Sequence, residues 1–224
     1  MKKITLLSIM IAGIAFAAFK NSGNPAVPGL MPENKIAMPI GTQLTYEVDI
    51  EKSTVGWHAK KATGQHYGTV KIAKGEIFRN KGLLNGGEFE LDMTSVADTD
   101  ITDPVYRAKL DGHLKSETFF DVTKFPKATF KIKIWAPITN QKPDAPNYYV
   151  KGDLTIKGIT KEISFPALLN LGDSLITADA ELKIDRTDFG IKYQSIKFDA
   201  GIGDKMINDE FELKVHLVAN RNKK

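Results

Sequence analysis

Hydrophobic and polar residues alternate along most of the chain from Leu44 onward. A period of two is typical of a β-strand with one buried face and one exposed face. The first such segment covers residues 44–50, and the second contains Val55, Trp57 and Ala59. The same alternation returns later in the chain, at residues 70–72, 89–93, 130–134, 154–156, 163–167, 178–184 and 211–217.

Turn signals separate these segments at hairpin spacing, so successive strands are expected to pair antiparallel. The predicted turns are "NGG" at 85–87, "KPDAPN" at 142–147, "KG" at 157–158 and "GD" at 172–173. One helical window covers about residues 105–119, where Leu110 and Leu114 are four apart and Pro104 can open the first turn. The pattern therefore predicts an all-β protein of eight or slightly more antiparallel strands, as a sandwich or closed barrel, with one or two short helices.

The polar faces of these strands carry charges such as Glu88, Glu90, Lys131 and Lys133. A polar, charged outer surface argues against an outer-membrane barrel, whose outer surface is apolar. We therefore expect no stable membrane insertion. A barrel with an apolar interior is either filled by its own side chains or holds one slender ligand.

The first 18 residues have the pattern of a secretory signal peptide. Lys2 and Lys3 precede an apolar run that ends in the small-residue pattern "AFA" at 15–17. An uncleaved anchor is the alternative, but the run is shorter than the roughly 20 residues of a spanning helix. Residues 19–41 are rich in proline and glycine and predict a flexible leader, which leaves residues 42–220 as the folded domain. The expected location is periplasmic or secreted.

Composition excludes several classes of function. The formal net charge is +4 and falls to about +2 without Lys2 and Lys3, too little to indicate a nucleic-acid partner. The chain has no cysteine, which excludes disulfides and thiol catalysis. The serines lie in no nucleophile-elbow pattern. We therefore predict no enzyme activity and no cofactor.

The histidines and acidic residues show no metal-binding motif, although a metal site built from distant residues remains open. The run "DTDITD" contains Asp98, Asp100 and Asp103 but lacks the glycine and glutamate of a calcium loop. We predict a solvated turn there, with Asp103 capping the following helix. In "DRTDFG" at 185–190, a structural ion pair of the arginine is favoured over catalysis by the two acids. We therefore predict no metal-binding residues. His216 is expected to face solvent.

Several longer motifs then carry a resemblance. The order "GQHYGTVKIAKGEI", "GGEFELDMTSV", "KLDGHLKSETFFDVTKFPKATFKI", "VKGDLTIKGITKEISFPALL" and "LKIDRTDFGI" resembles the YceI-like family of exported bacterial proteins over about residues 44–219. The resemblance implies a lipocalin-like antiparallel barrel whose internal tunnel binds isoprenoid or other long-chain lipids in the periplasm. The lipid differs between members, so the fold is expected to transfer better than the ligand.

Strand parity selects the residues that would line such a tunnel. Phe130 shares parity with Ile132 and Ile134, and Phe119 and Phe120 follow the helix near a barrel opening. The predicted ligand-binding residues are Trp57, Ile77, Phe89, Leu91, Phe119, Phe120, Phe130, Ile132, Phe165 and Phe211. The alternative is that these rings fill the barrel and that the protein is an exported stress-response or interaction domain acting through its surface. The expected partner is a long-chain isoprenoid or fatty lipid, and homodimer formation is left open.

Overall fold

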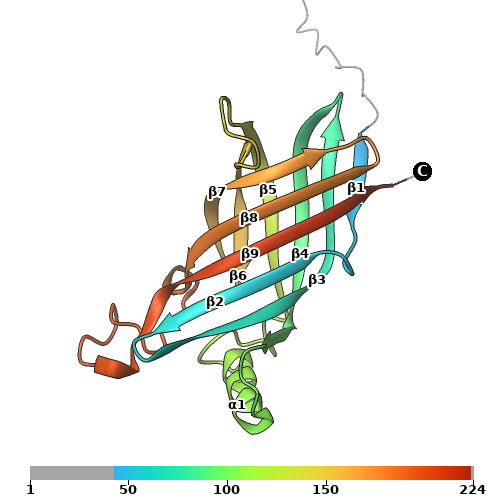
Figure 1. Ribbon diagram of the computed structural model, residues 1–224. Coiled ribbons are helices and arrows are strands. Elements are labelled where there is room, and N and C mark those ends of the chain that lie inside the picture. Colours follow the sequence, from blue (N-terminus) through green and yellow to red (C-terminus); the bar gives the residue numbers. More distant parts are fainter. Residues whose placement is uncertain (1–42, 223–224) are drawn as a thin grey trace, which may run out of the picture. The chain divides into compact units, whose positions relative to one another are not determined.

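The computed structural model describes residues 43–222, which form an antiparallel β-barrel with one α-helix (Figure 1). The predicted signal peptide and leader lie outside these residues. The predicted barrel of eight or slightly more strands is confirmed. Its strands are β1 (Leu44–Val48), β2 (Thr54–Lys61), β3 (Gly64–Asn80), β4 (Leu83–Asp98), β5 (Lys127–Pro137), β6 (Tyr148–Ile156), β7 (Ile159–Leu171), β8 (Leu175–Asp185) and β9 (Ile207–Arg221).

The strands follow each other in the sheet in the order β1-β3-β2-β9-β8-β7-β6-β5-β4. The sheet closes into a barrel because β4, at one end of this order, also pairs with β3. β1 and β2 share one position in the wall, between β3 and β9. The chain makes a turn between them, and the buried Ser53 bridges this break. Its Oγ accepts a hydrogen bond from Val218 N at 2.9 Å and donates one to Val218 O at 3.3 Å. Nine strands therefore build an eight-membered wall.

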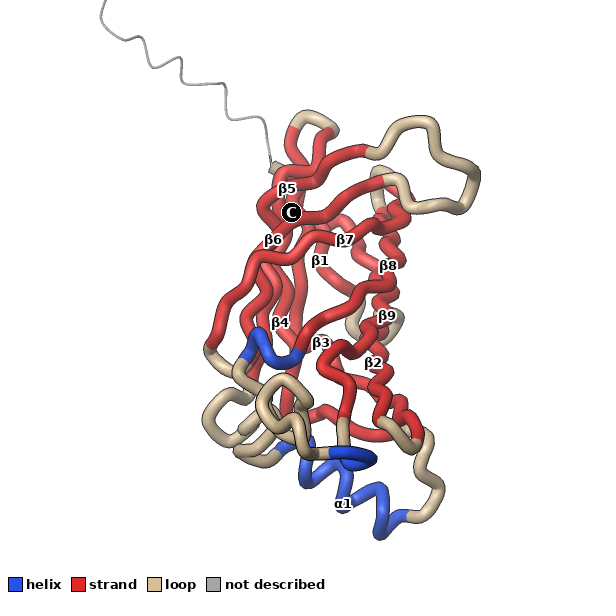
Figure 2. The backbone as a smooth tube through the Cα atoms, turned by 90° about the vertical axis from the view of Figure 1, so that its left-hand side faces the viewer, coloured by secondary structure: helices blue, strands red, loops and turns tan. Residues whose placement is uncertain are grey.

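Helix α1 (Pro104–Lys115) lies at one end of the barrel (Figure 2). Asp103 Oδ1 accepts hydrogen bonds from Val105 N and Tyr106 N, at 2.8 and 3.1 Å, so the predicted cap is confirmed. The helix ends before the predicted residue 119, because the Ser116 N–H and hydroxyl both bond back to His113 O. The short 3₁₀ helices η1 (Arg186–Phe189) and η2 (Gly203–Lys205) precede β9.

Two predictions about local structure are wrong. Ile134 is 49% exposed and faces outward, because a register shift between Ile132 and Ile134 reverses the parity of β5. The "NGG" at 85–87 is part of β4, and the hairpin turn lies at Lys81 and Gly82, whose φ angles are 49° and 84°. A two-residue hairpin turn with positive φ at both positions matches the twist of the strands.

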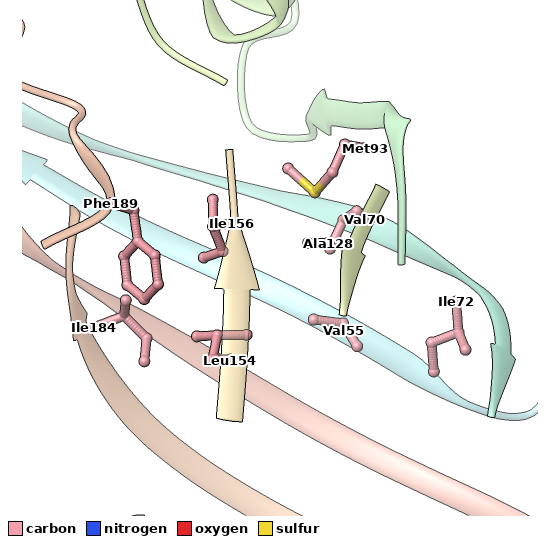
Figure 3. Packing of buried hydrophobic residues seen from close by; sticks show 9 residues of the cluster. All are labelled: Val55, Val70, Ile72, Met93, Ala128, Leu154, Ile156, Ile184 and Phe189. Atoms are coloured by element: carbon pink, nitrogen blue, oxygen red, sulfur yellow. The ribbon is translucent and has the colours of Figure 1, made fainter. Parts of the chain in front are cut away.

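The barrel core consists of three clusters of buried residues. The largest is shown in Figure 3 and contains Val55, Val70, Ile72, Met93, Ala128, Leu154, Ile156, Ile184 and Phe189. A second cluster surrounds Val150 and Leu169. The third, Tyr46, Ile77, Ile176 and Ala219, is fully buried and joins β1, β3, β8 and β9. There Tyr46 Oη donates to Asp173 O in the β7–β8 turn, at 3.1 Å.

Two glycines provide a test of this packing. A Cβ at Gly152 in β6 would lie 2.3 Å from Lys131 O, a backbone atom that cannot rotate away. We expect Gly152→Ala to lower the free energy of unfolding by about 1–3 kcal/mol. A Cβ at Gly112 in α1 would meet nothing within 4 Å, so Gly112→Ala should raise it by about 0.5–1 kcal/mol. Urea unfolding of both variants measures the difference, and equal stabilities would contradict this packing.

Candidate functional site

An apolar cavity of about 110 Å³ lies inside the barrel. Among its lining residues only Thr129 has a polar side chain. They are Val55, Ile72, Phe89, Leu91, Thr129, Phe130, Ile132, Trp135, Val150, Leu154, Ile163, Phe165, Ala167, Ala178, Ala180, Leu182, Leu213, Val215 and Leu217. The volume is several times the 10–15 Å³ or so that one water needs, but a lining with a single polar side chain offers water few hydrogen-bond partners. Such a space suits an apolar ligand.

The structure brings five of the ten predicted ligand-binding residues together in this lining. They are Phe89, Leu91, Phe130, Ile132 and Phe165. Three of the rings form a row through the interior: the centroids of Phe89 and Phe130 are 6.5 Å apart, and those of Phe130 and Phe165 are 5.6 Å apart. The rings come from β4, β5 and β7, and β6 lies between the last two in the sheet. Their contact with a ligand stays a prediction.

The other five predicted residues do not line the cavity. Ile77 belongs to the fully buried cluster with Tyr46, Ile176 and Ala219. The Trp57 ring lies over Gly68, where a Cβ would be 2.2 Å from Cζ2 of the indole. Phe120 and Phe211 pack against the largest core cluster. Phe119 packs edge-on against His113, with centroids 5.7 Å apart.

Sequence reasoning missed Trp135 and did not single out Ala167, Ala178 and Ala180. Trp135 points inward because the irregularity in β5 reverses the parity, and its Nε1 donates to Gly86 O at 3.1 Å. The alanines follow the alternation of β7 and β8, and Ala167 lies directly opposite Ala180. Their small side chains leave space on one side of the lumen that larger residues would fill.

A second hollow, of about 660 Å³, shares Phe89, Thr129 and Phe130 with the apolar cavity. Its lining also includes the charged residues Glu47, Lys74, Glu76, Glu88, Glu90 and Lys131. The rings of Phe89 and Phe130 therefore border both the apolar cavity and a hollow lined by charged residues.

Comparison with known proteins identifies the fold. A model of the YceI-like domain matches residues 46–219. The chain belongs to the YceI-like family. It is 37% identical to Protein YceI of Shigella flexneri over 91 residues, which cover 38% of this chain and 44% of that relative's length. It is 32% identical to a UPF0312 protein of Vibrio parahaemolyticus over 143 residues, covering 59% of this chain and 67% of that protein.

Solved structures share this YceI-like barrel. BcnA of Burkholderia cenocepacia matches with a TM-score of 0.61 and 26% identity, covering 77% of this chain and 99% of BcnA. A polyisoprenoid binding domain from Saccharophagus degradans, implicated in plant cell wall breakdown, matches with a TM-score of 0.57. That domain is 14% identical, with 80% of this chain and 99% of the domain covered, so the likeness shows the fold alone. In residues 43–222, no helix has the length and apolar character needed to cross a membrane.

The "DRTDFG" motif of this YceI-like chain is structural, as predicted. Arg186 is 2% exposed, and its Nη2 donates to Asp209 Oδ1 at 3.2 Å. The same guanidinium donates to backbone carbonyls 2.7–3.1 Å away, those of Ile191, Tyr193, Ile207 and Asn208. Asp185 binds Lys197 and caps η1 through Thr187 N, and these contacts hold its pKa below the ordinary value despite burial. The motif fixes the segment between β8 and β9.

Three histidines, His58, His66 and His216, lie close to a carboxylate from a neighbouring strand, whereas His113 packs against the rings of Phe119 and Tyr193. His216 faces solvent, as predicted, and its Nδ1 lies 2.7 Å from Asp179 Oδ1. The predicted solvated turn at "DTDITD" is wrong for Asp98, which is 3% exposed and bonds to Asp111 of α1 and to Ile101 N. Burial raises the pKa of Asp98 above its ordinary value.

Proposed function

We propose that the protein binds an isoprenoid or another long-chain lipid inside the barrel and carries or stores it. The observation that supports this proposal is the interior cavity, whose lining is almost entirely apolar and includes the row Phe89, Phe130 and Phe165. The polyisoprenoid-binding description of one structural neighbour supports the same class of ligand. The segment at residues 1–18 supports a periplasmic or secreted location. The geometry supports binding, not catalysis, because the cavity lining contains no ionisable side chain.

The energetics favour a long ligand over a short one. Burial of one methylene contributes about 0.8 kcal/mol, so twenty buried carbons contribute roughly 16 kcal/mol. Association costs an estimated 4–15 kcal/mol or so. A chain of eight carbons contributes only roughly 6 kcal/mol, which this cost can cancel. Length selectivity is therefore the signature we expect.

The size of the cavity favours a second candidate function. A volume of about 110 Å³ is smaller than that of most small-molecule pockets, roughly 300–1,000 Å³. In this alternative the barrel is filled by its own side chains, and the protein acts through its surface. A long-chain lipid is larger than this cavity, so lipid binding requires that lining side chains move to enlarge it.

Native mass spectrometry separates the two candidates. The full chain, processed by its exporting cell, is incubated with a polyprenol of eleven isoprene units or with octanoate, each delivered from the same detergent. We expect one polyprenol per chain and no retained octanoate. A protein that retains neither ligand would contradict the lipid-binding proposal and favour the filled barrel. Equal retention of both would contradict burial along a long cavity.

A further inference from the structure

Three side chains from separate parts of the sequence converge near α1. His66 lies in β3, Asp98 ends β4, and Asp100 lies in the loop from β4 to α1, which is visible in Figure 1. His66 Nδ1 is 3.2 Å from Asp100 Oδ2 and 3.7 Å from Asp98 Oδ2. One donor atom from each of the three residues lies within 4.8 Å of the other two. None of the three lines the apolar cavity.

The buried Asp98 carboxylate has one oxygen without a hydrogen-bond partner. Its side chain has 0% exposure, and Oδ1 accepts a hydrogen bond from Ile101 N at 2.8 Å. Oδ2 faces His66 and has no hydrogen-bond partner among the described residues. Leaving a buried carboxylate oxygen unsatisfied is costly, and buried charges in proteins are paired or bind metals.

The surrounding contacts hold this group in place. Asp100 Oδ1 accepts from Tyr67 N at 2.6 Å, which leaves Oδ2 facing His66. The Asp98 N–H donates to Asp111 Oδ1 of α1 at 2.7 Å. Each carboxylate therefore uses one oxygen to fix its orientation and presents the other to the imidazole. Outer hydrogen bonds of this kind orient the ligands of metal sites.

We propose that His66, Asp98 and Asp100 bind one divalent transition-metal ion, with Zn²⁺ as the best match. Zinc bonds to nitrogen and carboxylate oxygen are about 2.0–2.2 Å long, so tetrahedral ligands lie about 3.4 Å apart. The observed separations of 3.2 and 3.7 Å from His66 bracket this value. The side chains of His66 and Asp100 are 28% and 33% exposed, which leaves a side open for water as the fourth ligand. Calcium fits poorly because it takes six to eight oxygens or so.

Calorimetric titration of the full processed chain with ZnCl₂, after removal of any affinity tag, tests the proposal. We expect one Zn²⁺ per chain, no competition from a tenfold excess of Ca²⁺, and a raised melting temperature. His66→Gln and Asp98→Asn should each weaken binding at least tenfold. His216→Gln is the matched control, because it removes another His–Asp pair, with 2.7 Å between its atoms, and should leave binding unchanged.

Several outcomes would overturn the site. They are the absence of zinc binding by the parent chain, an equal loss in His216→Gln, and effective competition by calcium. Asp98→Asn affects a buried residue, so its far-ultraviolet circular dichroism is measured beside that of His66→Gln, whose residue is partly exposed. If Asp98→Asn does not fold, the test rests on His66→Gln alone. Full zinc affinity in a folded His66→Gln variant would refute the proposal.

Discussion

Replacement of Ala180 by phenylalanine is expected to weaken lipid binding at least 100-fold while the barrel stays folded. Ala180 lines the cavity and lies opposite Ala167, so a ring at this position enters space that two small side chains leave. Overpacking is expected to lower the free energy of unfolding by about 1–3 kcal/mol, the typical cost of a larger side chain in a core. Titration with a fluorescent polyprenol analogue measures the affinity.

Glu181→Phe is the matched control for this variant. Glu181 follows Ala180 in β8 but faces outward, with its carboxylate 2.8 Å from Lys214 Nζ. The same ring added there should leave the affinity unchanged. Binding that survives Ala180→Phe intact would place the ligand outside the lumen. Loss in both variants would indicate a general disturbance of β8 and not a blocked cavity.

Arg186→Met is expected to lower the free energy of unfolding by about 3–5 kcal/mol. Methionine replaces the length of the side chain but none of its donors. The carboxylate of Asp209 and the carbonyls that the guanidinium binds then stay buried without these hydrogen bonds. Each group left in this way lowers the stability of the folded state by its desolvation cost. Since a domain is typically stable by only about 5–15 kcal/mol, the variant should be close to unfolding at 37 °C.

Lys197→Met provides the comparison for Arg186→Met. Lys197 pairs with Asp185 and lies 3.8 Å from Asp209, but its side chain is half exposed, and exposed pairs are typically worth less than about 1 kcal/mol. Urea unfolding gives both values, and hydrogen exchange should show faster opening of residues 190–206 in Arg186→Met. A loss below about 1 kcal/mol for Arg186→Met would mean that this segment is not fixed by the guanidinium.

Much of the barrel follows from local rules in the sequence. Alternation identified the inward faces of β4, β7, β8 and β9, and the turn at Lys157 and Gly158 lies where predicted, with φ angles of 50° and 74°. Parity fails where a register shift inserts an extra residue. For that reason Ile134 was assigned to the interior and Trp135 was missed.

The other differences between prediction and structure concern where an inward residue lies along the barrel axis. Alternation with a period of two predicts only which face of the strand a residue occupies. Ile77 and Phe89 both follow an inward pattern, yet Ile77 is fully buried beside Tyr46, whereas Phe89 packs against that cluster and also lines the cavity. The meeting of His66 with Asp98 and Asp100 depends on the pairing of β3 with β4 across more than thirty residues of sequence. No local motif encodes this convergence.

The most direct test of the lipid-binding account uses the fluorescence of Trp135. The chain has two tryptophans, so Trp57→Phe leaves the cavity-lining Trp135 as the single reporter. A brominated long-chain lipid quenches a tryptophan only when it lies close to the ring. We expect saturable quenching at one lipid per chain, lost when Ala180→Phe is added. A lipid that binds without quenching Trp135 would contradict the claim that the ligand lies inside the barrel.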